Sequence, residues 1–193
     1  RFNFASSSSL VSQIQTGAPT DVFAAADLTS FDKLLATGNV ATRPKVFARN
    51  SMQLVVKPGN PLRISSVADL QKASVISLCA KTAPCGVYSA TVLSGYGVAI
   101  PESKITRGID AASTLNAVSA GDADAAIVYA TDALLAKKQV AAIPIPVGKN
   151  VKAMYGIGVV RGSKNSKQAD AFILFVLSPA GQKVLNTFGF LAP

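Results

Sequence analysis

Short apolar segments with the composition of buried strands alternate along this chain with segments of helical periodicity. Residues 21–25 have the first pattern, and Phe31, Leu34 and Leu35 then recur at helical spacing before Gly38. This alternation predicts an α/β fold in which mostly parallel sheets are flanked by helices. The other predicted strands are 1–5, 53–56, 75–78, 125–129, 141–145 and 154–160, and the other predicted helices are 10–15, 66–72, 87–93, 111–119, 131–137, 166–177 and one that begins at Ser178-Pro179.

Two extended segments, 53–56 and 157–160, separate a middle block from flanking blocks, and each block has strands and helices of its own. This organisation predicts two lobes joined by two crossings of the chain, with a hinge at the crossings and a ligand in the cleft between the lobes. The predicted boundaries are 1–53 with 157–193 for the first lobe, 54–156 for the second lobe, and 53–57 with 154–160 for the hinge. The same pattern also fits a single continuous sheet.

The composition is that of a well-packed globular protein with a basic surface. Of the 193 residues, 49% are hydrophobic and 15% are charged, and the formal net charge is +9. The lysines and arginines are scattered in no run longer than Lys137-Lys138, and no aromatic residues accompany them as in nucleic-acid-binding motifs. We therefore expect a solvated basic surface and no nucleic-acid partner. The apolar stretches are interrupted well before the ~20 residues that a membrane span needs.

Four consecutive serines, Ser6 to Ser9, lie between the predicted strand 1–5 and the predicted helix 10–15. Backbone N–H groups at the start of a helix have no intrahelical partner, so hydroxyls and N–H groups collect there. Together they predict an anion site that contains no positive charge. Ser6 and Ser7 are the candidate ligands, and the alternative is a solvated helix cap with spare serines.

Two further strand-to-helix corners follow the same plan. At one of them, Pro84, Cys85 and Gly86 begin a helix, and a small residue followed by glycine lets backbone N–H groups approach a ligand closely. At the other, Asp110 precedes the helix 111–119 as a favourable N-cap residue. Taken alone, the first also fits an ordinary loop and the second an ordinary helix cap.

Tyr129 ends the predicted strand 125–129. At the carboxyl end of a parallel sheet, its hydroxyl would point into a ligand cleft. The alternative is a tyrosine of the core.

The two cysteines are Cys79 and Cys85. Their spacing excludes a redox Cys-x-x-Cys motif, and without histidine a zinc site would need carboxylates to complete its ligands. Two interpretations remain, which are a pair of reduced thiols and a local disulfide formed in an oxidising compartment.

The residues for catalysis are largely missing. The chain has no histidine, so it cannot contain a Ser-His-Asp or Cys-His arrangement. The glycine-rich phosphate-binding motifs of nucleotide enzymes are also absent. We therefore expect a protein that is not an enzyme and that needs no cofactor.

Several blocks of the sequence resemble the molybdate-binding proteins of ABC importers, and they follow the family's order along almost the whole chain. The blocks are FASSS at 4–8, QI at 13–14, GAPTDVFAAAD at 17–27, PCGVYSA at 84–90, AIVYATDA at 126–133 and FGF at 188–190. The third block is quite specific, and the fifth is moderately so. The resemblance implies a two-lobed, periplasmic-binding-protein-like fold of type II, with molybdate or tungstate in a hinged cleft.

Carried over residue by residue, the resemblance implies a set of uncharged ligands that bind the oxyanion through its oxygens, with no direct ligand to the metal atom. The implied ligands are the hydroxyls of Ser7 and Tyr129 and the backbone N–H groups of Cys85 and Ala111, with Gly86 and Asp110 behind them. Ser6 stays a candidate ligand on the evidence of the serine corner alone. A tetrahedral dianion has acceptor oxygens and no donors, so hydroxyl and N–H groups are its matching partners.

The resemblance also implies a monomer outside the cytoplasm that delivers its ligand to the membrane permease of an importer. No signal peptide or lipid anchor is visible in these residues. The chain departs from the family in two respects. Arg1 matches the family's second strand, so the family's first strand, with its further serine ligand, and the long helix after it are not among these residues. The cysteine pair is the second departure.

Other functions remain as alternatives. One is an oxyanion-binding protein for sulfate or phosphate. An effector-sensing domain of a transcription regulator shares the two-lobed plan, but it would need a DNA-binding segment, which these residues do not contain. An enzyme that uses serine or tyrosine is disfavoured because the catalytic bases are missing.

Overall fold

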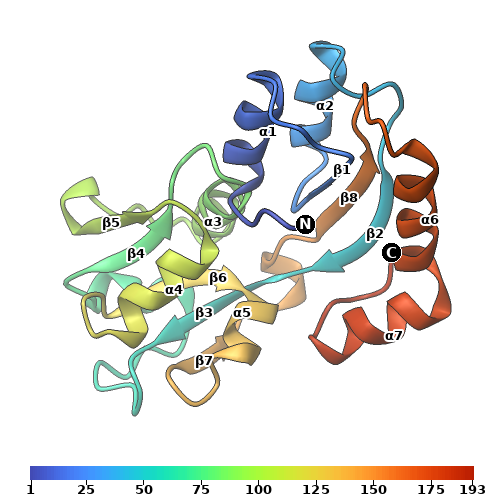
Figure 1. Cartoon of the computed structure of the whole chain (residues 1–193). Helices are drawn as coiled ribbons and strands as arrows, with labels where there is room; N and C mark the ends of the chain where they lie inside the picture. The colour runs from blue at the N-terminus through green and yellow to red at the C-terminus, as the bar shows by residue number, and fades with distance from the viewer. The chain divides into compact units, whose positions relative to one another are not determined.

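The chain divides into two compact units in a computed structural model that describes residues 1–193. Unit 1 consists of Arg1–Asn50 and Ala153–Pro193, and unit 2 is the continuous segment Ser51–Lys152. The sequence predicted the divisions a few residues later, after positions 53 and 156. The course of the chain through each unit can be followed by colour in Figure 1.

Unit 1 contains one small sheet and four helices. Its elements are α1 (Ser7–Gln15), β1 (Val22–Ala25), α2 (Thr29–Ala36), β2 (Lys45–Asn50), β8 (Ala153–Val159), α6 (Ser166–Leu177) and α7 (Pro179–Thr187). The strand order is β1-β8-β2, and β8 is antiparallel to both neighbours. The prediction of mostly parallel pairing is therefore wrong for this sheet. Strand β8 brings the chain back from unit 2 and lies between the two strands that precede unit 2.

The two faces of this sheet are covered by different helices. On one face, α1 and α2 bury Val11, Ile14 and Phe31, and the Phe31 ring lies 4.9 Å from that of Phe23 on β1. On the other face, Ile173 of α6 packs near Phe47. Figure 1 shows the two helix pairs on either side of the strands. Of the periodic residues that predicted α2, Phe31 and Leu34 are buried, whereas Leu35 is 37% exposed.

Residues 1–5 do not form the predicted strand. No strand pairs with them, and the side chains of Phe2 and Phe4 are 77% and 87% exposed. An extended segment without a hydrogen-bonded neighbour has no sheet to join. Helix α1 also begins earlier than predicted, because Ser6 is its N-cap and the serines that follow form its first turn.

Unit 2 contains a larger, mixed sheet. Its strands are β3 (Met52–Val56), β4 (Ile76–Cys79), β5 (Ile105–Gly108), β6 (Ala125–Tyr129) and β7 (Ala141–Pro144), and its helices are α3 (Pro84–Gly95), α4 (Ala111–Ser119), α5 (Ala130–Leu135) and the 3₁₀ turns Val67–Lys72, Glu102–Lys104 and Val147–Lys149. The order is β5-β4-β6-β3-β7. Strand β4 is parallel to β5 and β6, as predicted, whereas β3 is antiparallel to β6 and β7.

Helices cover both faces of this sheet. Leu115 of α4 and Ala133 of α5 belong to one buried cluster with Ala126 and Val128 of β6. The opposite face of β6 carries Tyr129, whose ring meets that of Tyr88 on α3 edge to face. None of the helices in either unit has the length and the apolar composition of a membrane span.

Candidate functional site

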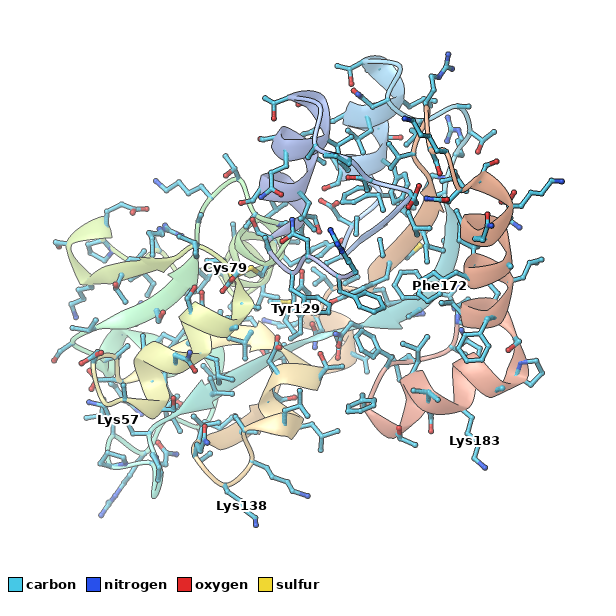
Figure 2. All side chains as sticks on the ribbon, viewed as in Figure 1. Lys57, Cys79, Tyr129, Lys138, Phe172 and Lys183 are labelled. Atoms are coloured by element: carbon cyan, nitrogen blue, oxygen red, sulfur yellow. A yellow bond between two sulfur atoms is a disulfide. The ribbon has the colours of Figure 1, made fainter.

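Three of the predicted ligand positions lie at one edge of the sheet of unit 2. Strands β5, β4 and β6 are adjacent and parallel, so their carboxyl ends reach the same edge. Cys79 at the end of β4 is the register partner of Gly108 at the end of β5, and Tyr129 ends β6. From these ends the chain continues into α3, α4 and α5 respectively. Figure 2 labels Cys79 and Tyr129 at this edge.

At the corner after β4, the backbone is arranged to expose an N–H group. Ala83 is extended, Pro84 is the first residue of α3, and Cys85 is the second. The N–H groups of the first helical turn have no intrahelical partner, so that of Cys85 is available to a ligand. Gly86 is required here, because a Cβ at this position would run into the carbonyl of Ala80.

At the corner after β5, Asp110 closes a capping box. Its carboxylate accepts a hydrogen bond from the N–H of Ser113 at 2.8 Å, and the hydroxyl of Ser113 accepts one from the N–H of Asp110 at 3.1 Å. The carboxylate is therefore committed to the helix cap that the sequence predicted. Ala111 follows as the first residue of α4, with its N–H at the open end of the helix.

Tyr129 lies at the junction of β6 and α5. Its side chain is only 6% exposed, and its ring centre is 6.3 Å from that of Tyr88, with the two planes at 73°. The same residue is the N-cap of α5. The aromatic contact fixes the direction of the phenol, which is a requirement for a hydroxyl that donates to a ligand.

The serine corner belongs to unit 1. Ser6 caps α1 and accepts a hydrogen bond from the N–H of Ser9 at 3.3 Å. Ser7 is buried, and its hydroxyl oxygen accepts a hydrogen bond from the N–H of Ala26 at 3.0 Å. A hydroxyl has one donor and two acceptor positions, so this contact leaves the proton of Ser7 able to donate. Ser7 is thus the better oriented donor, and Ser6 serves mainly the helix cap.

Comparison with known proteins identifies the family. Residues 1–191 match the bacterial extracellular solute-binding proteins over nearly the full chain. The chain belongs to this family. Members of the family bind solutes and are a non-enzymatic class.

The similarity of this solute-binding protein extends to curated relatives. The molybdate-binding protein ModA of Mycobacterium tuberculosis (strain H37Rv) is 33% identical over 193 residues, which are 100% of this chain and 73% of the relative. The molybdate-binding protein ModA of Escherichia coli (strain K12) is 27% identical over 198 residues, covering 97% of this chain and 76% of the relative. The resemblance drawn from the sequence blocks is confirmed.

Solved structures show the same fold. The periplasmic molybdate-binding protein of Azotobacter vinelandii superposes with a TM-score of 0.86 at 18% identity, covering 98% of this chain and 85% of that one. The sulfate-binding protein SubI of Mycobacterium tuberculosis gives a TM-score of 0.82 at 17% identity, covering 96% and 73%. At these identities the likeness shows the fold alone, which is the predicted fold of periplasmic binding proteins.

Sequence reasoning missed one residue of the solute-binding protein near the predicted ligands. Asp132 lies in the first turn of α5, and one of its carboxylate oxygens is buried without a hydrogen-bond partner. Burial raises the pKa of Asp132 to about 6, and the nearby charge of Asp110 acts in the same direction, while the N–H of Tyr129 opposes them. The block AIVYATDA contains this aspartate, but the sequence carries no sign that it is buried.

The cations near the corners of unit 2 are already paired. Arg107 donates to the carbonyl of Cys79 at 3.0 Å and to the carboxylate of Glu102 at 2.7 Å, and Lys81 lies 2.9 Å from the same carboxylate. Arg107 and Lys81 thus have partners of their own, and the predicted donors are hydroxyl and backbone N–H groups.

A hollow of about 330 Å³ in unit 1 is unrelated to the predicted ligands. It lies between β8, α6 and the segment that leads into β2, and its charged lining residues are Arg43, Lys45, Arg161 and Asp170. These four side chains are exposed, and the hollow shares no residue with the predicted ligand set. We assign the candidate site to the corners because they combine buried side chains with oriented N–H groups.

Proposed function

We propose that this protein captures molybdate or tungstate outside the cytoplasm and delivers it to an ABC importer. The observation that carries the proposal is the convergence of uncharged donors at the carboxyl edge of β5, β4 and β6. The curated relatives named as molybdate-binding proteins support the choice of ligand.

In this proposal, uncharged groups supply the hydrogen bonds to the oxyanion. Cys85 and Ala111 donate through their backbone N–H groups, and Tyr129 and Ser7 donate through their hydroxyls, with Ser6 beside them. Gly86 and Asp110 do not touch the ligand but shape the corners that present Cys85 and Ala111. Each hydrogen bond to a charged acceptor contributes roughly 1.5–3 kcal/mol.

The donor set also supplies selectivity. A site in which every group already donates its proton to the ligand disfavours an oxyanion that carries a proton, because that proton would face another donor. Protonated phosphate is therefore rejected. Sulfate has no proton at neutral pH, so its exclusion depends on the spacing of the donors, which must suit the larger molybdate ion.

The absence of lysine and arginine from the donor set suits a carrier. A ligand held by neutral donors is released when the donors separate, without the long-range attraction of a fixed positive charge. We propose that the membrane permease of the importer is the partner to which the protein, as a monomer, releases its ligand. No cofactor takes part in this cycle.

Calorimetric titration with molybdate, tungstate, sulfate and phosphate tests the proposal. We expect saturable heats with molybdate and tungstate and at least tenfold weaker binding of sulfate and phosphate. Equal affinities for sulfate and molybdate would instead assign the protein to a general sulfate-type receptor. Failure to bind any of the four ions would overturn an oxyanion function.

A further inference from the structure

Cys79 connects both N–H-presenting corners of unit 2. It is fully buried at the end of β4, and its sulfur is bonded to that of Cys85 in α3. On its other side, the sulfur lies 3.3 Å from the hydroxyl oxygen of Thr114, a residue of α4. One sulfur atom therefore touches both of the helices that carry the proposed backbone donors.

Thr114 in turn holds the start of α4. Its side chain is fully buried, and its hydroxyl donates to the carbonyl of Asp110 at 2.7 Å. This carbonyl belongs to the peptide whose N–H is that of Ala111. The hydroxyl of Thr114 thus sits between the donor peptide of α4 and the sulfur of the disulfide.

The backbone of β5 is shaped around this threonine. A Cβ at Gly108 would run into the hydroxyl of Thr114 and the side chain of Ser113. Only a glycine allows α4 to lie this close to the end of β5. Contacts through Gly108, Thr114 and Cys79 therefore form a continuous path from one donor corner to the other.

From these contacts we infer that Thr114 and the Cys79–Cys85 disulfide set the spacing between the N–H groups of Cys85 and Ala111. In this inference, the Thr114 hydroxyl and the disulfide do not touch the ligand and act only by positioning the two N–H groups. The inference rests on the proposed function, because the spacing matters only if both N–H groups bind one oxyanion. Fixed spacing favours ions of one size, and donors held in place before binding lose less freedom when the ligand arrives.

Substitutions of Thr114 separate its two roles. Thr114→Val keeps the branched shape and removes the hydroxyl, whereas Thr114→Ser keeps the hydroxyl and removes a methyl group. Thr91→Val is the matched control, because Thr91 is an exposed threonine in α3 whose hydroxyl bonds only the carbonyl of Val87, at 3.1 Å. Cys79→Ala with Cys85→Ala removes the disulfide.

The measurements are the affinities for molybdate and sulfate, the unfolding temperature without ligand, and amide hydrogen exchange of the unliganded protein. Thr114→Val should weaken molybdate binding about tenfold, which is the effect expected from the loss of one buried hydrogen bond at a donor corner. It should also lower the ratio of molybdate affinity to sulfate affinity. Thr114→Ser and Thr91→Val should stay within about twofold of wild type. The N–H groups at positions 87 and 114, which close the first turns of α3 and α4 on the carbonyls of Ala83 and Asp110, should exchange faster in Thr114→Val and in the double cysteine variant.

The double cysteine variant should shift affinity in the same direction as Thr114→Val, and the two changes combined should have less than their summed effect. If Thr114→Val lowers the unfolding temperature but leaves the ratio of molybdate affinity to sulfate affinity and the N–H exchange at positions 87 and 114 unchanged, Thr114 is only a core residue and this inference is overturned. If the wild-type protein binds none of the oxyanions, the proposed function fails and this inference fails with it.

Discussion

The hydroxyl oxygen of Ser7 accepts a hydrogen bond from the backbone N–H of Ala26 at 3.0 Å. This contact ties the first turn of α1 to the segment that follows β1. It also fixes the direction in which Ser7 can donate, because one side of the oxygen is already in use. The serine corner is therefore more than a solvated helix cap.

Ser7→Ala should weaken molybdate binding by about 1.5–3 kcal/mol, because it removes a donor to a charged ligand. It should also lower the free energy of unfolding by roughly 1 kcal/mol through loss of the contact with Ala26. Titration calorimetry and urea denaturation measure the two effects. Ser12→Ala is the control, since Ser12 is exposed and bonds only the carbonyl of Ser8 through its side chain. Equal affinities of the two variants would remove Ser7 from the ligand set.

Tyr129→Phe should cost about 1.5–3 kcal/mol of molybdate affinity and change the free energy of unfolding by less than that. The ring and its contact with Tyr88 are kept, so only the hydroxyl is tested. Tyr96→Phe is the matched control, because Tyr96 keeps its ring beneath the ammonium group of Lys149. Normal binding by Tyr129→Phe would leave Tyr129 as a core residue alone.

Gly86→Ala should destabilise the protein by about 1–3 kcal/mol and distort the corner that presents Cys85. The added methyl group meets the rigid carbonyl of Ala80, which a side-chain rotation cannot relieve. Gly148→Ala places the same methyl group where no atom lies within 4 Å, so its unfolding temperature should match that of wild type. A Gly86→Ala protein of unchanged stability would contradict the close approach.

Asp132 should make stability depend on pH between about 4 and 6. Its folded-state pKa is raised from 3.8 to about 6, so the folded protein holds this proton more tightly than the unfolded chain. The contribution of this group therefore favours folding below about pH 4 and is lost as the pH rises through 6. Asp132→Asn should unfold at higher urea concentrations than wild type at pH 8, with a gain of up to about 3 kcal/mol, and should match wild type near pH 4. Wild type and Asp132→Asn share all their other carboxyl groups. If the difference between their free energies of unfolding did not vary with pH, the raised pKa of Asp132 would be refuted.

Protein unfolded without a reductant should contain no free thiols, because Cys79 and Cys85 are joined. The chain-entropy model assigns roughly 2–3 kcal/mol of stability to so small a loop. Thiol titration before and after reduction tests the bond, and urea denaturation under the two conditions measures its contribution. Two titratable thiols in protein secreted through an oxidising compartment would rule out the bridge.

Local signals predicted the best-defined elements closely. Strand β6 and helix α4 have the predicted bounds, since an apolar run defines the strand, and Asp110 and Gly121 punctuate the helix. Strands β2 and β5 escaped prediction because their sequences, KVFARN and ITRG, are half polar. Their pairing depends on neighbouring strands that lie far away in the sequence. The failed strand at 1–5 illustrates the reverse case, in which a suitable sequence has no neighbour to pair with.

The sequence also predicted part of the candidate site. The corners at Cys85 and Ala111 were located because proline, glycine and a capping aspartate mark helix starts, although their roles as donors came from family resemblance. The disulfide was one of two interpretations that the sequence left open. Thr114 and Asp132 could not be found in this way, because burial and contact with Cys79 are properties of the folded chain.

The position of β8 has a consequence for the order in which the two units can fold during synthesis. Strand β8 is the middle strand of the sheet of unit 1, yet it follows the whole of unit 2 in the chain. On the ribosome, β1 and β2 therefore emerge before β8, the strand that pairs with both of them. They cannot form their sheet until Ser51–Lys152 and then β8 have been synthesised. The side-chain amide of Asn150 then accepts a hydrogen bond from the N–H of Met52 at 3.0 Å and donates one to the carbonyl of Met52 at 2.8 Å. These bonds connect the end of unit 2 to its beginning. Domains generally fold as units during synthesis, so the nested unit is complete while the enclosing one still lacks its centre.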